Sequence, residues 1–294
     1  APAKWKERPV AFDTSCYGCH VSLLSTNYDL KTNSYKTTWR EPGIQCENCH
    51  GGTDAHSRTM RQTPKGKKPA DLKIISAKHF TSSEHNDACA PCHAKMKPIS
   101  GSFKPSERFF DHFDLVALED KDFYPDGRSS GDNHTYTLWR LSPCVISGKL
   151  SCLHCHTSGG RYKFRAKDRA NNACLPCHRK RVENSASHTH HSAGSAGSKC
   201  ISCHMPSTDF TRTKRTDHSM LPPAPAASIK FKSPNACNIC HRNRDAAWAD
   251  RLIRQWHPRD YQAPLIYRAG LLEAARNRDW TRLDDMLGYL ASKN

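Results

Sequence analysis

Apolar side chains are sparse along most of this chain and follow no regular period. From residue 1 to residue 242 they stand singly or in short clusters, such as the aromatic run at residues 109–113, among polar, glycine and proline residues. This pattern predicts short helices joined by irregular chain, with little β-sheet. Pro91 and Pro98 are expected to stop any long helix in this part of the chain.

After residue 243 the pattern changes to a helical one. A first amphipathic stretch ends at Pro258, and further helices are expected at about 263–276 and about 280–292. The apolar positions of the first stretch are Ala246, Ala247, Trp248, Leu252, Ile253 and Trp256. We therefore predict a small α-helical appendix at residues 243–294, following regions 1–143 and 144–242.

Composition limits the core that the chain can build from its own side chains. Only 36% of the 294 residues are hydrophobic, and the mean hydropathy is −0.77. No apolar run approaches the ~20 residues that a membrane helix needs, so no transmembrane segment is expected. A core made only of side chains would be thin.

Fourteen of the fifteen cysteines belong to a five-residue unit, C-x-x-C-H, that occurs seven times. In this signature of a c-type haem, the two thiols form thioethers to one porphyrin and the histidine binds the iron. Zinc sites and disulfides also use paired cysteines, but neither explains a histidine after every second cysteine. The cysteine pairs are Cys16 and Cys19, Cys46 and Cys49, Cys89 and Cys92, Cys152 and Cys155, Cys174 and Cys177, Cys200 and Cys203, and Cys237 and Cys240.

The sequence therefore predicts seven covalently bound haem c groups, three in region 1–143 and four in region 144–242. We expect coil and short α-helices to wrap a closely packed chain of haems, which itself forms the core. The motifs that begin at Cys152, Cys174 and Cys200 follow one another so closely that their porphyrins must be neighbours. The proximal iron ligands are His20, His50, His93, His156, His178, His204 and His241.

Eleven further histidines could supply the second, distal ligand of each iron, which is enough for bis-histidine coordination throughout. Six-coordinate haems have no open position and favour electron transfer over substrate binding. A polar loop at residues 184–199 carries three of these histidines, of which we take the last two as candidates. The distal candidates are His56, His79, His85, His112, His154, His190, His191 and His218.

Cys144 is the cysteine outside the seven motifs. Three roles are open to it: a buried small hydrophobic residue, a partner in an intermolecular disulfide, or a thiolate ligand of a haem iron.

The formal charge of +17 could suggest a nucleic-acid partner, but the predicted cofactors change that interpretation. Each haem brings two propionates, so the charge of the loaded protein falls to about +10 when oxidised and about +3 when reduced. Much of the lysine and arginine excess can pair with propionates. The remainder favours an acidic redox partner rather than nucleic acid.

Residues 126–258 resemble multihaem c-type cytochromes that end in a tetratricopeptide- or HEAT-like helical tail. The resemblance lies in Asp126-Gly-Arg128, His188-Thr-His-His191, Cys200-Ile-Ser-Cys-His-Met-Pro206, Arg215-Thr-Asp-His-Ser219 and Ser233-Pro-Asn-Ala-Cys-Asn-Ile-Cys-His241. It implies exported electron transfer, with His56, His190 or His191, and His218 as distal ligands. Many relatives carry a histidine just after the fourth motif, whereas here Thr157-Ser-Gly-Gly160 follows, so that iron must find another ligand or stay open.

These observations predict a periplasmic or extracellular electron carrier rather than an enzyme, because haem c is attached outside the bacterial cytoplasm. The small residues at Ala1-Pro-Ala suit a mature end left by signal cleavage. Redox proteins or other copies of the chain, arranged as an oligomer or filament, are the expected partners. The alternative is a multihaem oxidoreductase acting on small nitrogen or sulfur compounds at an open or Cys144-ligated haem.

Overall fold

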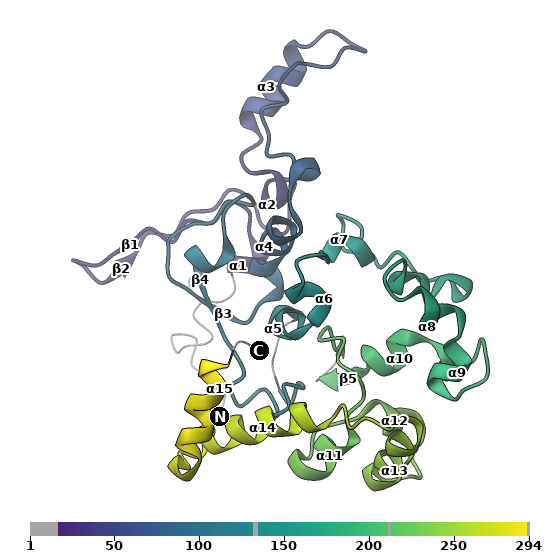
Figure 1. The fold of residues 1–294 in the computed structure, drawn as a ribbon. Helices are drawn as coiled ribbons and strands as arrows, with labels where there is room; N and C mark the ends of the chain where they lie inside the picture. The colour runs from purple at the N-terminus through teal and green to yellow at the C-terminus, as the bar shows by residue number, and fades with distance from the viewer. Residues whose placement is uncertain (1–16, 132–134, 211–212, 293–294) are drawn as a thin grey trace. The chain divides into compact units, whose positions relative to one another are not determined.

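The computed structural model describes residues 17–131, 135–210 and 213–292. Short helices and coil make up most of these ranges, with little sheet, as the sequence predicts (Figure 1). The described strands form three separate two-stranded antiparallel hairpins. Within the described ranges, no helix is both long and apolar enough to cross a membrane.

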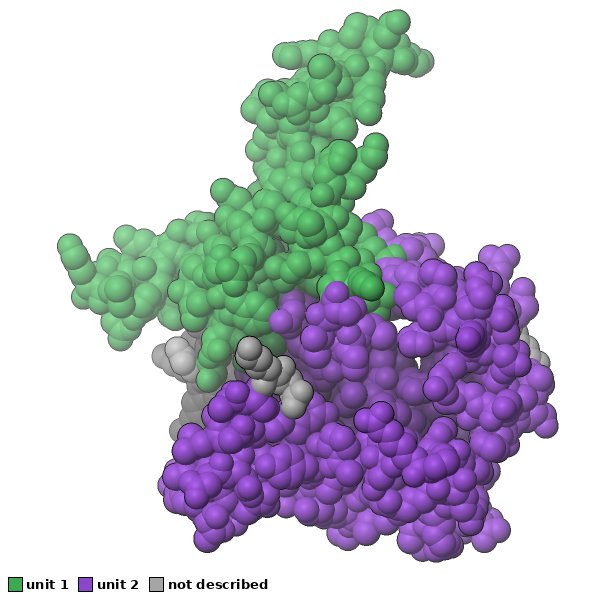
Figure 2. Space-filling view, viewed as in Figure 1, with its two compact units in different colours: residues 1–115, 148–153 green, residues 116–147, 154–294 purple. Residues whose placement is uncertain are grey.

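The chain divides into two compact units (Figure 2). Unit 1 comprises residues 1–115 and 148–153, and unit 2 comprises residues 116–147 and 154–294. The division passes through the fourth C-x-x-C-H motif, so that Cys152 belongs to unit 1 whereas Cys155 and His156 belong to unit 2. The division into a three-haem region (1–143), a four-haem region (144–242) and a helical tail (243–294) remains a prediction.

Unit 1 is built from short elements, of which the longest is a twelve-residue helix, α4 (Ser82–His93). A capping box starts this helix, since Thr81 and Glu84 satisfy one another's backbone N–H groups. Pro91 lies inside this helix, which ends two residues later at His93, so no long helix continues past the third motif. The other elements are α1 (Tyr17–His20), β1 (Tyr28–Asp29), β2 (Ser34–Tyr35), α2 (Glu47–His50), α3 (Asp54–Gln62), η2 (Ala77–His79), β3 (Met96–Pro98), η3 (Phe109–Asp111) and β4 (Phe113–Leu115).

The aromatic run of residues 109–113 packs on itself in unit 1. Phe109 is fully buried, and its ring stacks on Phe113 with the ring centres 5.1 Å apart. Phe113 also begins β4, which pairs with β3 from Met96 to Pro98. The aromatic run therefore packs beside the β3–β4 hairpin, which begins three residues after the third motif.

Unit 2 carries short helices around its haem motifs, followed by the tail. The tail has helices where the apolar spacing predicted them: α13 (Ala246–Trp256), α14 (Ala263–Arg276) and, after the 3-10 turn η7 (Trp280–Arg282), α15 (Leu283–Ala291). The other elements are α5 (Thr135–Leu141), α6 (Pro143–Ile146), α7 (Cys152–Cys155), η4 (Lys167–Arg169), η5 (Asn172–Cys174), α8 (Arg179–Glu183), α9 (Ser185–Thr189), η6 (Ala196–Ser198), α10 (Cys200–His204), β5 (Ser207–Phe210), β6 (Thr213–Thr216), α11 (Pro225–Phe231) and α12 (Ala236–Cys240).

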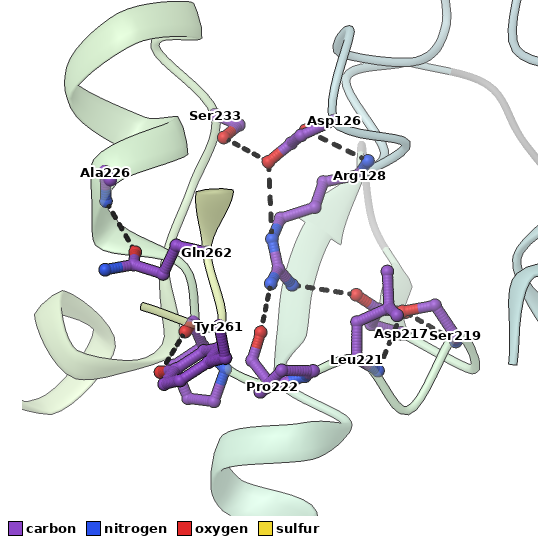
Figure 3. Close-up of polar contacts among 11 residues, drawn as sticks. Asp126, Arg128, Asp217, Ser219, Leu221, Pro222, Ala226, Ser233, Tyr261 and Gln262 are labelled. Atoms are coloured by element: carbon purple, nitrogen blue, oxygen red, sulfur yellow. Dashed lines mark hydrogen bonds and ion pairs between the residues drawn. The ribbon is translucent and has the colours of Figure 1, made fainter. Parts of the chain in front are cut away.

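The apolar core of unit 2 is small and consists largely of alanine. One cluster joins α11 to α14 through Ala224, Ala227, Phe231 and Ala269. Buried polar side chains supplement it. Gln262 is almost fully buried; its Oε1 accepts a hydrogen bond from the Ala226 N–H at 3.0 Å, as Figure 3 shows. Hydrogen bonds thus fix α11 to the tail where apolar contact area is limited.

Arg276, at the end of α14, attaches the tail to the segment that precedes the haem-binding part of unit 2. Its guanidinium donates to the carbonyls of Phe123 at 2.8 Å and Asp120 at 3.2 Å, and also to that of Leu118. Burial lowers the pKa of Arg276. One planar, always-charged group therefore satisfies three carbonyls of a segment that has no regular secondary structure of its own.

We expect Arg276→Met to reduce the free energy of unfolding by about 2 to 3 kcal/mol, because it removes charge-assisted hydrogen bonds from three carbonyls. Denaturant titration followed by circular dichroism at helical wavelengths measures the change. Arg282→Met is the control: Arg282 makes an exposed ion pair with Asp285, and its loss should change stability by less than about 0.5 kcal/mol. Equal effects of the two substitutions would contradict the anchoring role.

Candidate haem-binding site

The local backbone places the residues of most motifs on a single turn. The motifs that begin at Cys46, Cys89, Cys152, Cys200 and Cys237 each lie in or directly beside a short α-helix. Residues three and four apart share one face of a helix, so both thiols and the imidazole of one motif face the same side. Cys16 lies outside the described residues; the rest of its motif forms α1.

All fourteen described cysteines are free thiols. Among the described residues, no group of three or more histidine, cysteine, aspartate or glutamate side chains is placed to hold a metal ion. The motifs therefore present two thiols and one imidazole on a turn, which is the donor set that a covalently attached haem requires.

In unit 1, thiols of different motifs meet. A hydrogen bond with the Cys92 thiol lowers the pKa of Cys19 to about 7. Cys89 likewise contacts Cys152, whose backbone N–H donates to Asn86 Oδ1 at 2.9 Å. Burial raises the pKa of Cys49, with a further contribution from the nearby Cys89 thiol. The third motif is thus the neighbour of the first, the second and the start of the fourth.

In unit 2, the motifs adjoin one another in sequence order. A hydrogen bond with Cys174 lowers the pKa of Cys200 to about 7. Cys174 also lies within electrostatic reach of Cys155. Burial raises the pKa of Cys203 to about 11, and the thiols of the last motif add to this shift. The fourth, fifth, sixth and seventh motifs therefore form an unbroken series.

Three proximal histidines of unit 2 each face a second imidazole. Ring centres are 6.4 Å apart for His156 and His218, with 25° between the planes. They are 6.3 Å apart, at 12°, for His204 and His188, and 6.1 Å apart, at 43°, for His241 and His191. Two imidazoles on opposite sides of one metal, each at ~2 Å, hold their centres about 6 Å apart. These separations fit an iron between the rings.

The hydrogen bonds of four of these rings leave Nε2 available for a metal, whereas Nδ1 of His188 accepts from the Arg181 guanidinium at 2.7 Å. Nδ1 lies near a backbone carbonyl in four of them: His156 to Gly160 at 3.0 Å, His218 to Thr216 at 2.8 Å, His191 to Thr189 at 2.6 Å and His204 to Met220 at 3.4 Å. A carbonyl only accepts, so Nδ1 must carry the proton and Nε2 keeps its lone pair for a metal. In unit 1, His50 and His56 have the same arrangement, with the carbonyls of Ile75 and Leu72.

Other distal candidates use Nε2 within the protein. Nε2 of His85 bonds to the Ala77 carbonyl at 3.0 Å, and that of His154 to the Ala173 carbonyl at 2.8 Å. His112 lies between Ser100 and Glu107, with its Nε2 3.3 Å from the carboxylate. In these contacts the nitrogen that a haem iron would need has a protein partner.

Of the three histidines in the loop, His188 rather than the candidate His190 faces a proximal histidine. His190 adopts a left-handed conformation with φ 55° at the end of α9, and its ring stacks on Trp256 at 4.2 Å. His188, which was not among the candidates, instead faces His204. Burial is the main cause that lowers the pKa of His188 to about 4, so its imidazole is neutral at neutral pH, as a metal ligand must be. No periodicity or neighbouring residue in the sequence distinguishes these two histidines.

The remaining candidates are His79 and Cys144. His79 is exposed at the end of η2, and the proximal histidines His20, His93 and His178 are also exposed. Cys144 is half-buried in the first turn of α6 and lies within electrostatic reach of Cys174.

Comparisons with known proteins give one family match and one structural match. Residues 3–51 match the model of the cytochrome c554 and c-prime family. The fold resembles the crystal structure of the outer cell wall cytochrome OcwA, with a TM-score of 0.57 and 17% identity, over 96% of this chain and 68% of that one. No curated protein sequence matches the chain significantly. The family model spans the first two C-x-x-C-H motifs and supports covalently bound haem c there, whereas the likeness to OcwA concerns the fold.

Proposed function

We propose that this chain is an exported heptahaem cytochrome c that conducts electrons between redox partners. The observation that carries the proposal is the series of adjoining motifs in unit 2, three of which have their proximal imidazole faced by a second one at 6.1–6.4 Å. When bound, haem supplies a one-electron iron couple. The two thiols of each motif would hold one porphyrin by thioethers, and the facing imidazoles of these three motifs would be the iron ligands.

In this proposal His218, His188 and His191 are the distal ligands of the fourth, sixth and seventh motifs. For unit 1, His56 is the distal candidate whose Nε2 is kept free by an Nδ1 contact with a carbonyl. An iron with an imidazole on both sides has no position for a substrate, which favours conduction over catalysis at these haems. The absence of a histidine just after His156 then does not leave that iron open, because His218 reaches it from another part of the chain.

Charge favours acidic partners for the loaded protein. The formal charge of +17 exceeds what seven pairs of propionates neutralise in either redox state, and the excess is larger when the irons are oxidised. Long-range attraction of this kind accelerates the encounter with an acidic donor or acceptor and weakens as ionic strength rises. An acceptor outside the cell, and end-to-end assembly of copies, are extensions of the same proposal.

We expect the mature chain to carry seven haems that remain attached after denaturation. Intact-mass measurement of the denatured protein counts them. Replacing Cys152 and Cys155 together by serine should reduce the count to six, whereas Cys144→Ser should leave it at seven. Fewer than seven haems on the unaltered chain, or a low-spin spectrum that changes when cyanide or nitrite is added, would contradict the conducting role.

Gly197 provides a test of the His191 assignment. A Cβ at residue 197 would collide with ring carbons of His191 and lie 2.8 Å from its Nε2, so Gly197→Ala must displace that imidazole. We expect about one-seventh of the low-spin ferric signal in electron paramagnetic resonance to be lost or altered. Gly288→Ala, whose added Cβ meets no atom within 4 Å, is the control and should leave the signal unchanged. An unchanged spectrum in Gly197→Ala would remove His191 from the ligand set.

A further inference from the structure

A tight turn in unit 2 buries two charged side chains at positions 126 and 128. The Tyr124 N–H donates to the Arg128 carbonyl at 2.7 Å, and the Gly127 N–H donates to the Tyr124 carbonyl at 2.9 Å. Gly127 has φ 87°, which suits glycine and lets the chain reverse within this turn. As a result Asp126 and Arg128 point inward and are only 3% and 4% exposed.

Arg128 is the centre of the polar network that Figure 3 shows. Its Nη1 donates to Asp217 Oδ2 at 3.0 Å, and its Nη2 donates to the Pro222 carbonyl at 3.2 Å. Its Nε lies 3.6 Å from Asp126 Oδ2, which also accepts a hydrogen bond from Ser233 Oγ at 2.6 Å. The guanidinium thus contacts three separate parts of the chain through its fixed fork of donors.

Two of these contacts bracket His218. Asp217 precedes it, and the other carboxylate oxygen of Asp217 accepts from the Ser219 N–H at 2.7 Å. The Asp217 N–H donates to the Pro206 carbonyl at 2.9 Å, while Pro222 follows four residues after the histidine. The backbone that carries His218 is therefore fixed on both sides by one arginine.

Stability alone does not explain why Asp126 and Arg128 are buried here. Removing ions from water costs several kcal/mol for each, and a buried ion pair is often no more stabilising than apolar residues of the same volume. What the guanidinium offers instead is direction, because its donors and their acceptors have a defined geometry. Fixed geometry matters most for a ring that must face His156 across about 6 Å.

We propose that Arg128 is the positioning residue for His218, holding its imidazole opposite His156 through Asp217 and Pro222. The inference rests on the proposed ligand pair, which it extends by naming the residue that keeps the pair aligned. Arg128 itself touches neither ring in this network. Its effect on the haem of the fourth motif is indirect.

The test uses the full-length, haem-loaded protein and electron paramagnetic resonance of its ferric state. Arg128→Gln should convert the fourth haem from low-spin to high-spin, a loss of about one-seventh of the low-spin signal, and the open iron should then bind cyanide. Asp217→Asn should produce the same loss, and the double substitution should produce no more than either alone. Arg128→Lys keeps the charge but not the fork and should lose less of the signal.

Arg254→Gln is the matched control, because Arg254 also joins two carboxylates of unit 2, those of Asp250 and Asp260. It should leave all haems low-spin. His218→Ala tests the His156–His218 ligand pair separately from the positioning role of Arg128. If it leaves the spectrum unchanged, the ligand pair itself is wrong.

If His218→Ala opens one haem while Arg128→Gln and Asp217→Asn retain the full low-spin signal, the ligand pair stands and the positioning role is overturned. Should Arg128→Gln fail to accumulate, Asp217→Asn decides the question alone, since it breaks the same link and leaves the arginine in place.

Discussion

Three imidazoles that follow C-x-x-C-H turns in unit 2 each face a second imidazole across about 6 Å, and the arrangement of this unit depends on that facing. One imidazole of each pair follows directly from a C-x-x-C-H turn, where helical geometry places it on the same side as two thiols. The other comes from a distant segment and must be held in position independently. His218 lies 62 residues after His156, as their numbers show, and still meets it at 6.4 Å. In unit 2 the segments between and after the motifs therefore bring these second imidazoles into place.

Because apolar side chains are few, polar contacts with defined direction do much of this positioning. Arg128, Arg276 and Gln262 are three such residues in unit 2, and each satisfies backbone carbonyls or N–H groups that no helix or strand satisfies. The small alanine-rich cluster between α11 and α14 could not orient loops in this way, since dispersion contacts have little directionality. Irregular chain can be ordered when its backbone groups find such partners.

The three histidines of residues 188–191 make three different ring contacts. His188 faces His204, and His191 faces His241, so that one short segment reaches two different motifs. His190 lies between them in the left-handed conformation and packs on Trp256 of the helical tail. The contact of His190 with Trp256 therefore lies beside both histidine pairs. It connects the helical tail to the sixth and seventh motifs, although the tail contains no motif itself.

Much of the architecture could be predicted from the residues alone. The scarcity of periodic apolar positions predicted short helices and coil, the spacing from Ala246 to Trp256 predicted α13, and the repeated pentapeptide predicted where the thiols and proximal histidines cluster. These are local properties, since a turn of helix depends on residues within a few positions of one another. The effect of Pro91 is local in the same way, since α4 ends two residues after it.

Which imidazoles face one another, by contrast, was decided by tertiary structure. Histidines of the same loop look alike in sequence. Whether the Nε2 of a ring is available depends on which nitrogen bonds to a backbone carbonyl: His218 bonds to Thr216 through Nδ1, whereas His154 bonds to Ala173 through Nε2. That choice is made by segments far apart in the chain. The sequence by itself determined which residues can clamp a haem; only the folded chain decided which imidazoles face one another, because that depends on long-range packing rather than on spacing.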